Sequence, residues 1–309
     1  MSSERTLMVP DGLAGDRVDA GLSRMLGLSR TRAADLIDAG HVEIDGSAVA
    51  SRSVRLEPGM MLFVHLPDEA PAVAVRPQIA PGMSLVHQDE DLVVVDKPVG
   101  VAAHPSAGWS GPTVLGHLAA AGVSIRTSGD AERQGIVSRL DVGTSGLMVV
   151  ARTERAYTTL KDAFRAREVG KVYHAVCQGR PERGAGTIEA PIGRSPHHDY
   201  KFAVRQDGKH SVTHYSTLEE LSGATLLRVK LETGRTHQIR VHMAALHHPL
   251  VGDPLYGADP TIAERVGLRR QWLHAMELTF VHPVSREQVT FSSQYPSDLQ
   301  HALDALRDA

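Results

Sequence analysis

The spacing of apolar residues changes twice in the first 66 residues, which predicts a small module of two helices followed by strands. Val18, Leu22 and Met25 recur at helical intervals, and Gly27 ends this first helix. A second helix is predicted over residues 29–39, where the apolar positions again follow a helical repeat.

Residues 41–66 carry strand signals instead. The segment 41–46 alternates Val42 and Ile44 with polar residues and ends in an Asp-Gly pair, which favours a hairpin. A last short strand of the module is predicted over the apolar residues 61–66.

Four prolines interrupt residues 67–82. Proline is excluded from helix interiors and from central strands, so this stretch is predicted to be an extended, semi-stiff linker. We therefore expect three parts, which are a module over residues 1–66, the linker, and a body over residues 83–309.

The body alternates short apolar runs with turn residues, which is typical of an α+β protein with a mixed β-sheet. Helical spacing appears in two places, and it predicts helices over residues 153–167 and 237–246. Strands are predicted over residues 92–98, 146–152, 172–179, 225–232 and 276–283.

Charge is distributed unevenly along a chain of 309 residues with ordinary globular composition. The formal net charge is −3, so the protein is not a bulk polycation. Residues 165–240 nevertheless hold 13 Lys and Arg against 8 Asp and Glu. A basic middle region in an acidic chain is the expected signature of a polyanionic partner.

Several other classes of protein lack support. One cysteine, Cys177, excludes an internal disulfide and a zinc site built from paired cysteines. The glycine motifs of phosphate loops and dinucleotide-binding turns are absent. No apolar run approaches the ~18 residues that span a bilayer, and the start shows no signal-peptide pattern. We therefore expect a cytoplasmic protein.

The most unusual stretch covers residues 136–152. Asp141 stands between an apolar run and the turn Gly143-Thr-Ser-Gly146, which leads into a strongly apolar strand. A tight turn by itself favours Asp, Thr, Ser and Gly, because their side chains bond nearby backbone groups. The alternative is that the glycines let a ligand approach the backbone while Asp141 is presented as a reactive carboxylate.

Residues 231–257 contain the cation that such a carboxylate would need. Arg235 and Arg240 flank the start of the predicted helix. An arginine facing Asp141 would hold it in its charged form and orient it through hydrogen bonds. An ordinary surface helix is the alternative. The two histidines at the start of this helix are five positions apart, which is neither same-face spacing, so no metal site is predicted.

Tyr173 lies at the start of a predicted strand. A lone tyrosine in a strand usually packs in the core. Because aromatic residues make up only 4% of the chain, Tyr173 becomes a candidate platform for stacking a nucleobase.

Three arginines, Arg24, Arg30 and Arg32, surround the junction of the two N-terminal helices. Cations beside a helix N-terminus suit contact with phosphates. The same module also carries aspartates close to these arginines, which favour an ordinary solvated surface instead: Asp16, Asp19, Asp35 and Asp38.

Taken together, these segments resemble two known families. Residues 16–63 resemble the S4 RNA-binding domain, whose helix-to-strand signature is similar to L-S-R-T-R-A-A-D-L-I-D-A-G-H-V-E-I-D-G. Residues 84–296 resemble the RluA/RluD family of RNA pseudouridine synthases, with five blocks in the expected order. The blocks are D-E-D-L-V-V-V-D-K-P-V-G-V-A-A-H-P (89–105), R-L-D-V-G-T-S-G-L (139–147), K-V-Y (171–173), G-R-T-H-Q-I-R-V-H with H-P-L-V-G-D-P-L-Y-G (234–257), and L-H-A-M-E-L-T-F-V-H-P (273–283).

The resemblance implies a pseudouridine-synthase fold, with a central mixed, largely antiparallel β-sheet, beside a small S4-like α/β module. It implies isomerisation of uridine to pseudouridine, with RNA as the partner and large-subunit ribosomal RNA as the expected substrate. No cofactor, metal or membrane is implied, and we expect a monomer.

The resemblance also assigns residues. Asp141 would be the essential carboxylate, Tyr173 would stack on the target base, and Arg240 would pair with Asp141. Residues expected to contact RNA are Arg139, Thr144, Arg235, His237, Arg24, Arg30 and Arg32. One position departs from the family pattern, because Ser138 stands where the family commonly has His.

Three alternatives remain at this point. The substrate could be transfer RNA, or the protein could be a non-catalytic RNA-binding or ribosome-assembly protein with a synthase-like body. A hydrolase would instead pair Asp141 with a histidine of residues 237–248, within hydrogen-bond reach. The synthase interpretation requires Asp141, Tyr173 and Arg240 to converge on one basic cleft.

Overall fold

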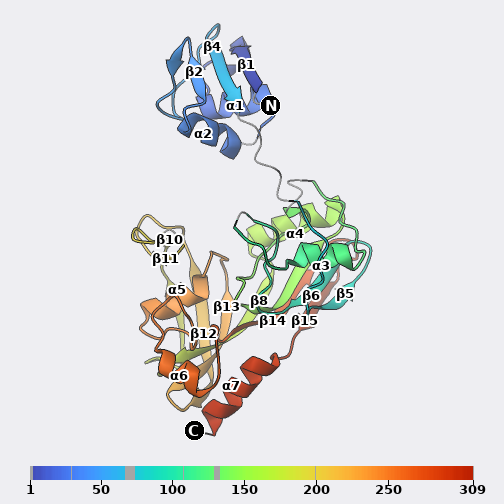
Figure 1. The fold of residues 1–309 in the computed structure, drawn as a ribbon, viewed down its shortest axis with the longest axis vertical. Helices are drawn as coiled ribbons and strands as arrows, with labels where there is room; N and C mark the ends of the chain where they lie inside the picture. The colour runs from blue at the N-terminus through green and yellow to red at the C-terminus, as the bar shows by residue number, and fades with distance from the viewer. Residues whose placement is uncertain are drawn as a thin grey trace. The chain divides into compact units, whose positions relative to one another are not determined.

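The chain folds into two units, Met1–Ala72 and Val73–Ala309. The structure is a computed structural model, and it describes residues 3–28, 30–66, 74–106, 108–128, 133–198 and 200–308. Figure 1 shows both units as ribbons. No helix among these residues is long and apolar enough to cross a membrane.

The first unit is a four-stranded antiparallel sheet with two helices. Its elements are β1 (Ser3–Met8), α1 (Val18–Leu26), α2 (Arg30–Asp38), β2 (Val42–Ile44), β3 (Ser47–Ala48) and β4 (Met61–Leu66), with a 3-10 turn at Asp11–Leu13. The strand order is β1-β4-β2-β3. Gly27 adopts a left-handed conformation and ends α1, as predicted. The predicted hairpin after Ile44 is confirmed as β2–β3. Residue 29, where the second helix was predicted to begin, lies outside the described residues.

The second unit is built on a nine-stranded mixed sheet. Its strand order is β5-β6-β7-β14-β8-β13-β12-β9, and β15 pairs with β14. Its strands are β5 (Ser84–Gln88), β6 (Leu92–Lys97), β7 (Ser145–Ala151), β8 (Gly170–Gln178), β9 (Ala185–Glu189), β12 (Val212–Leu221), β13 (Ala224–Leu231), β14 (Leu273–Val281) and β15 (Gln288–Ser292), with a separate hairpin of β10 (Ile192–Arg194) and β11 (Phe202–Val204). Its helices are α3 (Val114–Ala120), α4 (Glu154–Ala166), α5 (Gln238–Ala245), α6 (Pro260–Arg265) and α7 (Ser297–Arg307).

The sheet is largely antiparallel, as expected. Among the strand pairings of the described residues, β7 and β14 run parallel, and the other neighbours in this sheet run antiparallel. All five predicted strands of the body and both predicted helices are confirmed, with ends that move by one to three residues. Asp141, just before β7, and Tyr173, on β8, belong to the middle of the sheet, where β7, β14 and β8 are neighbours.

Helices cover both faces of this sheet. Val93 and Val95 of β6 pack on one face with α3, whereas Leu92 and Val94 pack on the other face with α4. In the other half of the sheet, β8 and β13 pack against α5 on one face and against α6 and α7 on the other. In Figure 1, α3 and α4 lie near β5 and β6, whereas α5 and α6 lie near β12. Burial on both faces explains why β6 and β7 read as continuous apolar runs.

The described part of the proline-rich stretch, residues 74–82, belongs to the second unit and packs beside α3. The backbone N–H of Gln78 donates to the Gly116 carbonyl at 3.0 Å, and the N–H of Ala80 donates to His117 Nδ1 at 3.1 Å. Ala80 is buried in the core beside α3. Residues 67–73 lie outside the described residues, so the linker and domain bounds stay a prediction.

Candidate active site

Asp141 is presented by a tight turn that leads directly into β7. The Thr144 backbone N–H donates to the Asp141 carbonyl at 3.0 Å and closes this turn. A Cβ at Gly143 would lie only 2.6 Å from Oε1 of Gln271, so a larger residue there would displace the end of that buried side chain. At Gly146 a Cβ would lie 2.4 Å from the Ala275 carbonyl oxygen, because β14 runs close beside this point. These contacts fix the direction in which Asp141 leaves the backbone.

Arg240 reaches Asp141 from α5, as the resemblance implied. Its Nη1 donates to Asp141 Oδ2 at 3.2 Å. Its Nε and Nη2 donate to Asp253 Oδ2 and Oδ1 at 2.7 and 2.8 Å, which forms a bidentate pair. The Arg240 side chain is 4% exposed and that of Asp253 is 0% exposed. Burial acts against the charged guanidinium, but the bonds to Asp253 and the charge of Asp141 raise the pKa of Arg240.

Asp253 therefore performs a function that the sequence reasoning missed. Because it neutralises Arg240 from behind, Arg240 can direct one N–H at Asp141 without being an uncompensated buried cation. Asp141 itself is 23% exposed, and no hydrogen-bond donor among the described residues reaches its Oδ1. One carboxylate oxygen is thus held by Arg240, and the other is available for chemistry.

Tyr173 lies on β8, half-buried, between Ala275 of β14 and Val229 of β13. Burial, and then the nearby charge of Asp141, raise the pKa of the Tyr173 phenol. Its hydroxyl therefore stays protonated at neutral pH. Tyr173, Asp141 and Arg240 line one small hollow of ≈ 70 Å³.

His237 also lies beside Asp141, but out of hydrogen-bond reach. Its Nε2 is 3.8 Å from Asp141 Oδ2, and its Nδ1 is 2.7 Å from the Tyr256 hydroxyl. That hydroxyl already accepts the backbone N–H of Phe202 at 3.1 Å, so we assign its proton to the bond with Nδ1. Burial lowers the pKa of His237 against the opposing effect of Asp141. A neutral His237 without a bond to Asp141 does not form the pair that the hydrolase alternative requires.

The hollow opens into a larger cleft of ≈ 1030 Å³ whose lining is strongly basic. Asp141 is the one carboxylate among the described residues that line it. Six arginines line the same cleft: Arg133, Arg139, Arg235, Arg240, Arg269 and Arg270. A basic cleft around a single carboxylate fits a polyanion that carries its reacting group to Asp141.

A buried network lies behind the turn at Asp141. Arg270 Nη1 donates to the Gly143 carbonyl at 3.3 Å and to Ser145 Oγ at 3.1 Å, and its Nε and Nη2 form a bidentate pair with Asp298 at 2.7 and 2.9 Å. Ser145 Oγ also lies 2.8 Å from His274 Nδ1. Burial, and then the charge of Arg270, lower the pKa of His274 to about 4, so this imidazole is neutral. The network ties the turn after Asp141 to the first turn of α7.

The remaining residues predicted to contact RNA fall into three groups. Arg139 and Arg235 are exposed on the wall of the cleft. Thr144 is buried, and its Oγ1 accepts a hydrogen bond from Gln271 at 3.2 Å. In the first unit, the exposed Arg24 and Arg30 form ion pairs with Asp16 and Asp19, and Arg32 is also exposed.

Comparisons with known proteins give this geometry a family. The family model for RNA pseudouridylate synthase matches residues 91–245, and that for the S4 domain matches residues 16–62. The chain therefore belongs to the RNA pseudouridylate synthase family, and it is an isomerase that acts on RNA. The resemblance found in the sequence blocks is confirmed.

Relatives match over nearly the full length. The chain is 59% identical over 305 residues to an uncharacterized RNA pseudouridine synthase of Mycobacterium bovis, covering 99% of each chain. It is 42% identical over 317 residues to the ribosomal large subunit pseudouridine synthase D of Xanthomonas campestris, covering 99% of this chain and 94% of that one. A solved structure of human RNA pseudouridylate synthase domain containing 4 aligns at a TM-score of 0.58 and 27% identity, covering 72% of this chain and 93% of the human chain.

Proposed function

We propose that this protein converts uridine to pseudouridine in large-subunit (23S) ribosomal RNA, with Asp141 as the essential carboxylate. The observation that carries the proposal is the convergence of Asp141, Tyr173 and Arg240 on one hollow that opens into a basic cleft. Relatives named as large subunit pseudouridine synthase D support the ribosomal substrate. The same convergence disfavours a non-catalytic RNA-binding protein with a synthase-like body, because a decayed site would not need these three groups around one hollow.

The reaction leaves the composition of the nucleotide unchanged. The N1–C1′ bond of the uridine breaks, the base rotates while it is held, a C5–C1′ bond forms, and the C5 proton is lost while N1 gains one. The free Oδ1 of Asp141 is placed to act on the nucleotide as a nucleophile or as a base towards the sugar. Arg240 holds the other oxygen and keeps the carboxylate aimed at the hollow.

Tyr173 forms the platform for the extracted base. Taking a uridine out of its stack costs a few kcal/mol, and stacking on an aromatic ring recovers about 1–3 kcal/mol per base. After the new bond forms, the phenol is also positioned to assist removal of the C5 proton. We assign Tyr173 these two functions.

The rest of the RNA meets the cleft and the N-terminal unit. We assign phosphate contacts to Arg139 and Arg235 and further substrate contacts to Thr144 and His237, all of which line the hollow or the cleft. Docking contacts are assigned to Arg24, Arg30 and Arg32 in the first unit. The ion pairs of Arg24 and Arg30 with Asp16 and Asp19 must then open or be shared when RNA binds.

The proposed organisation is an S4-like domain over residues 1–66, a linker over 67–82 and a catalytic domain over 83–309. All three catalytic groups come from one chain, which supports a monomer. The proposed reaction needs no cofactor or metal. Ribosomal RNA as substrate supports action in the cytoplasm.

Pseudouridine mapping of ribosomal and transfer RNA tests the substrate. RNA is taken from cells that lack the gene, from cells complemented with wild-type protein, and from cells complemented with Asp141→Asn. We expect at least one position of large-subunit RNA to lose pseudouridine, to regain it with wild type, and to stay unmodified with the variant. Loss of pseudouridine confined to transfer RNA would identify transfer RNA as the substrate instead. An unchanged pseudouridine map would contradict the proposal.

A further inference from the structure

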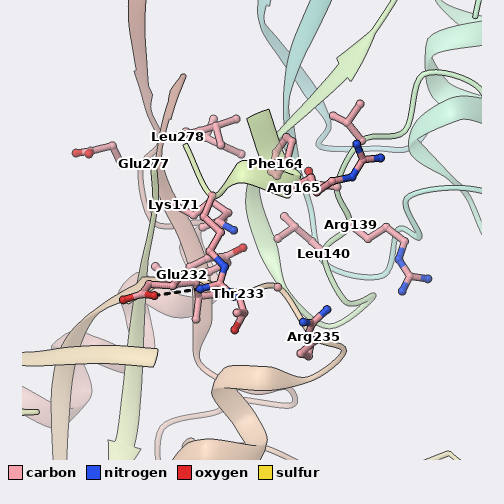
Figure 2. Close-up of a pocket in the computed structure, with 18 residues that line it drawn as sticks. Arg139, Leu140, Phe164, Arg165, Lys171, Glu232, Thr233, Arg235, Glu277 and Leu278 are labelled. Carbon is pink, nitrogen blue, oxygen red and sulfur yellow. Dashed lines mark ion pairs between the residues drawn. The ribbon is translucent and has the colours of Figure 1, made fainter. Parts of the chain in front are cut away.

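A second cavity, of ≈ 410 Å³, adjoins the catalytic hollow. It shares Tyr173, Arg139, Leu140 and Arg235 with that hollow, and it extends from Tyr173 along β8 towards the end of α4. Figure 2 shows the residues that line it, with Lys171 among them. The proposed reaction at Asp141 does not use this space.

Lys171 is the unusual group in the cavity. It lies two residues before Tyr173 on β8, so both side chains leave the same face of the strand, about 6.6–6.8 Å apart along it. Lys171 is half-buried, and its Nζ lies 5.7 Å from the centre of the Phe164 ring. No carboxylate among the described residues pairs with it. Burial, and then the charge of Arg167, lower the pKa of Lys171.

The two carboxylates of the cavity wall are not available to Lys171. Glu232 pairs with Arg167 at 3.6 Å and with His214 at 2.7 Å, and the first of these pairs is the dashed line in Figure 2. Glu277 lines the cavity too, but among the described residues it forms no ion pair with Lys171. In Figure 2 its carboxylate points away from the other labelled side chains.

The cavity therefore has an excess of positive charge with no anion of the protein at its centre. Arg139, Arg165, Arg167 and Arg235 line it together with Lys171. Phe164, Leu140 and Leu278 supply an apolar wall on which part of a nucleotide can rest. An unpaired, half-buried ammonium destabilises a fold, so a ligand that neutralises it explains why the group is there.

We propose that this cavity binds the nucleotide next to the target uridine, with its phosphodiester group against Lys171. This inference rests on the proposed function, because it places a second nucleotide of the same RNA beside the base on Tyr173. Lys171 is then a substrate-binding residue that sets how far the target strand advances into the hollow. A free anionic metabolite in the same cavity is the competing outcome that the experiments separate.

The first experiment compares Lys171→Met with Lys230→Met. Lys230 is exposed on β13 and pairs with Val172, the neighbour of Lys171, so its side chain lies on the opposite face of the sheet from Lys171. The Lys230→Met substitution therefore removes one cation from the same region without changing the cavity. For binding to a single-stranded RNA fragment, we expect Lys171→Met to reduce the slope of log affinity against log salt by about 0.7–1, and Lys230→Met to leave it unchanged. Equal slopes for all three proteins would overturn the proposal.

Thermal unfolding of the free proteins keeps this result interpretable. Removing an unpaired, half-buried cation should leave the melting temperature of Lys171→Met unchanged or raise it, while RNA affinity falls. Lys171→Arg should restore the salt slope. A variant that loses both stability and affinity, without rescue by arginine, would assign Lys171 a structural function instead and contradict the proposal.

The second experiment locates the phosphate. A modified substrate RNA carries one uncharged methylphosphonate, which is moved through the linkages around the target uridine. At one linkage next to the target, we expect the methylphosphonate to lower the kcat/KM of wild type relative to unmodified RNA. The same methylphosphonate should not lower the kcat/KM of Lys171→Met any further, because the two changes remove the same contact. The competing outcome is that the methylphosphonate and the Lys171→Met substitution lower kcat/KM independently at every linkage, while inorganic phosphate or mononucleotides inhibit wild type. That result would indicate a free anionic metabolite in the cavity and contradict the proposal. If wild type modified no RNA, the proposed function would fail, whereas the salt comparison would still report on Lys171.

Discussion

At the scale of single residues, Lys97 is a fully buried lysine whose pKa is affected by the charge of Asp141. Lys97 ends β6 and is fully buried, and its Nζ donates to the carbonyls of Pro98 and Val101 at 3.0 and 2.9 Å. Burial lowers its pKa to about 7, although the charge of Asp141 acts in the opposite direction. Lys97 therefore changes its charge near neutral pH, and it lies close enough to Asp141 for the charge of that carboxylate to act on it.

The lowered pKa of Lys97 predicts an unusual pH dependence of stability. Between pH 7 and about 10.5 the unfolded chain binds more protons at this position than the folded chain does, so the free energy of unfolding rises with pH. The slope from this group is at most about 1.4 kcal/mol per pH unit. Urea unfolding at pH 7, 8 and 9 should show wild type gaining stability relative to Lys97→Met. A constant difference between the two proteins would contradict a lowered pKa at Lys97.

At the scale of elements, the turn after Asp141 depends on α7. Arg270 bridges the two, with bonds to Gly143 and Ser145 on one side and to Asp298 on the other. α7 is far from the reacting groups in sequence, yet its first turn anchors the guanidinium that holds the catalytic turn. Asp141 therefore has its direction set by Arg240 in front and by Arg270 behind.

Replacing Arg270 should consequently affect turnover more than binding. For Arg270→Met we expect kcat to fall by about tenfold to a hundredfold, because small displacements of a reacting group have effects of that order. The Kd for RNA should change less, because Arg270 is buried and its charge is already paired with Asp298. Arg307→Met is the matched control. Arg307 lies in α7 and forms a bidentate pair with Glu219 of β12, and among the described residues none of its hydrogen bonds reaches the turn at Asp141. Single-turnover rates and filter binding measure both quantities. Equal effects of the two variants would indicate general destabilisation through α7.

The elements that the sequence pattern predicted are strands buried on both faces and helices with one apolar side. β6, β7, β8, β13 and β14 are central strands with apolar runs, and α4 has a clear apolar stripe. The pattern missed α3, α6 and α7 and the strands β1, β5, β9, β12 and β15. α7 carries Leu299, Leu303 and Leu306 at helical spacing, so its signal was present. β12 mixes polar and apolar residues and needs its partners β9 and β13 to be stable.

The site was predictable only through the ordered blocks. Asp141 and Arg240 are 99 positions apart, and no local pattern shows that they touch. Asp253, Tyr256 and Gln271 lay inside or beside the recognised segments but had no predicted function. Their importance appears only when α5, the catalytic turn and β14 are brought together, because each acts on another side chain and not on a substrate.

At the scale of the whole molecule, we assign the reaction to the second unit and RNA docking to the first unit, and each unit has its own apolar core. The first unit has its own apolar core, which includes Val18, Leu36 and Leu62. The residues of the hollow and the cleft all belong to the second unit. Deleting residues 1–72 therefore removes no part of the catalytic site.

This separation predicts how a truncated protein behaves. Without residues 1–72 we expect kcat on a short RNA substrate to stay within a few-fold of the full chain, while affinity for long RNA falls and its salt slope becomes shallower by about 0.7 for each lost single-strand phosphate contact. Circular dichroism confirms that the truncated chain is folded. A folded truncation with no activity on any substrate would show that the first unit takes part in the chemistry.

The most direct test of the account is pseudouridine formation by Asp141→Asn on a defined RNA. Asn keeps the shape of the side chain and removes its charge, so we predict RNA binding close to that of wild type and no detectable pseudouridine by tritium release or mass spectrometry. Asp304→Asn is the control, since Asp304 is an exposed carboxylate paired with Arg307 and should leave turnover unchanged. Turnover by Asp141→Asn near the wild-type rate would contradict the central claim that this carboxylate breaks and rebuilds the bond between base and sugar.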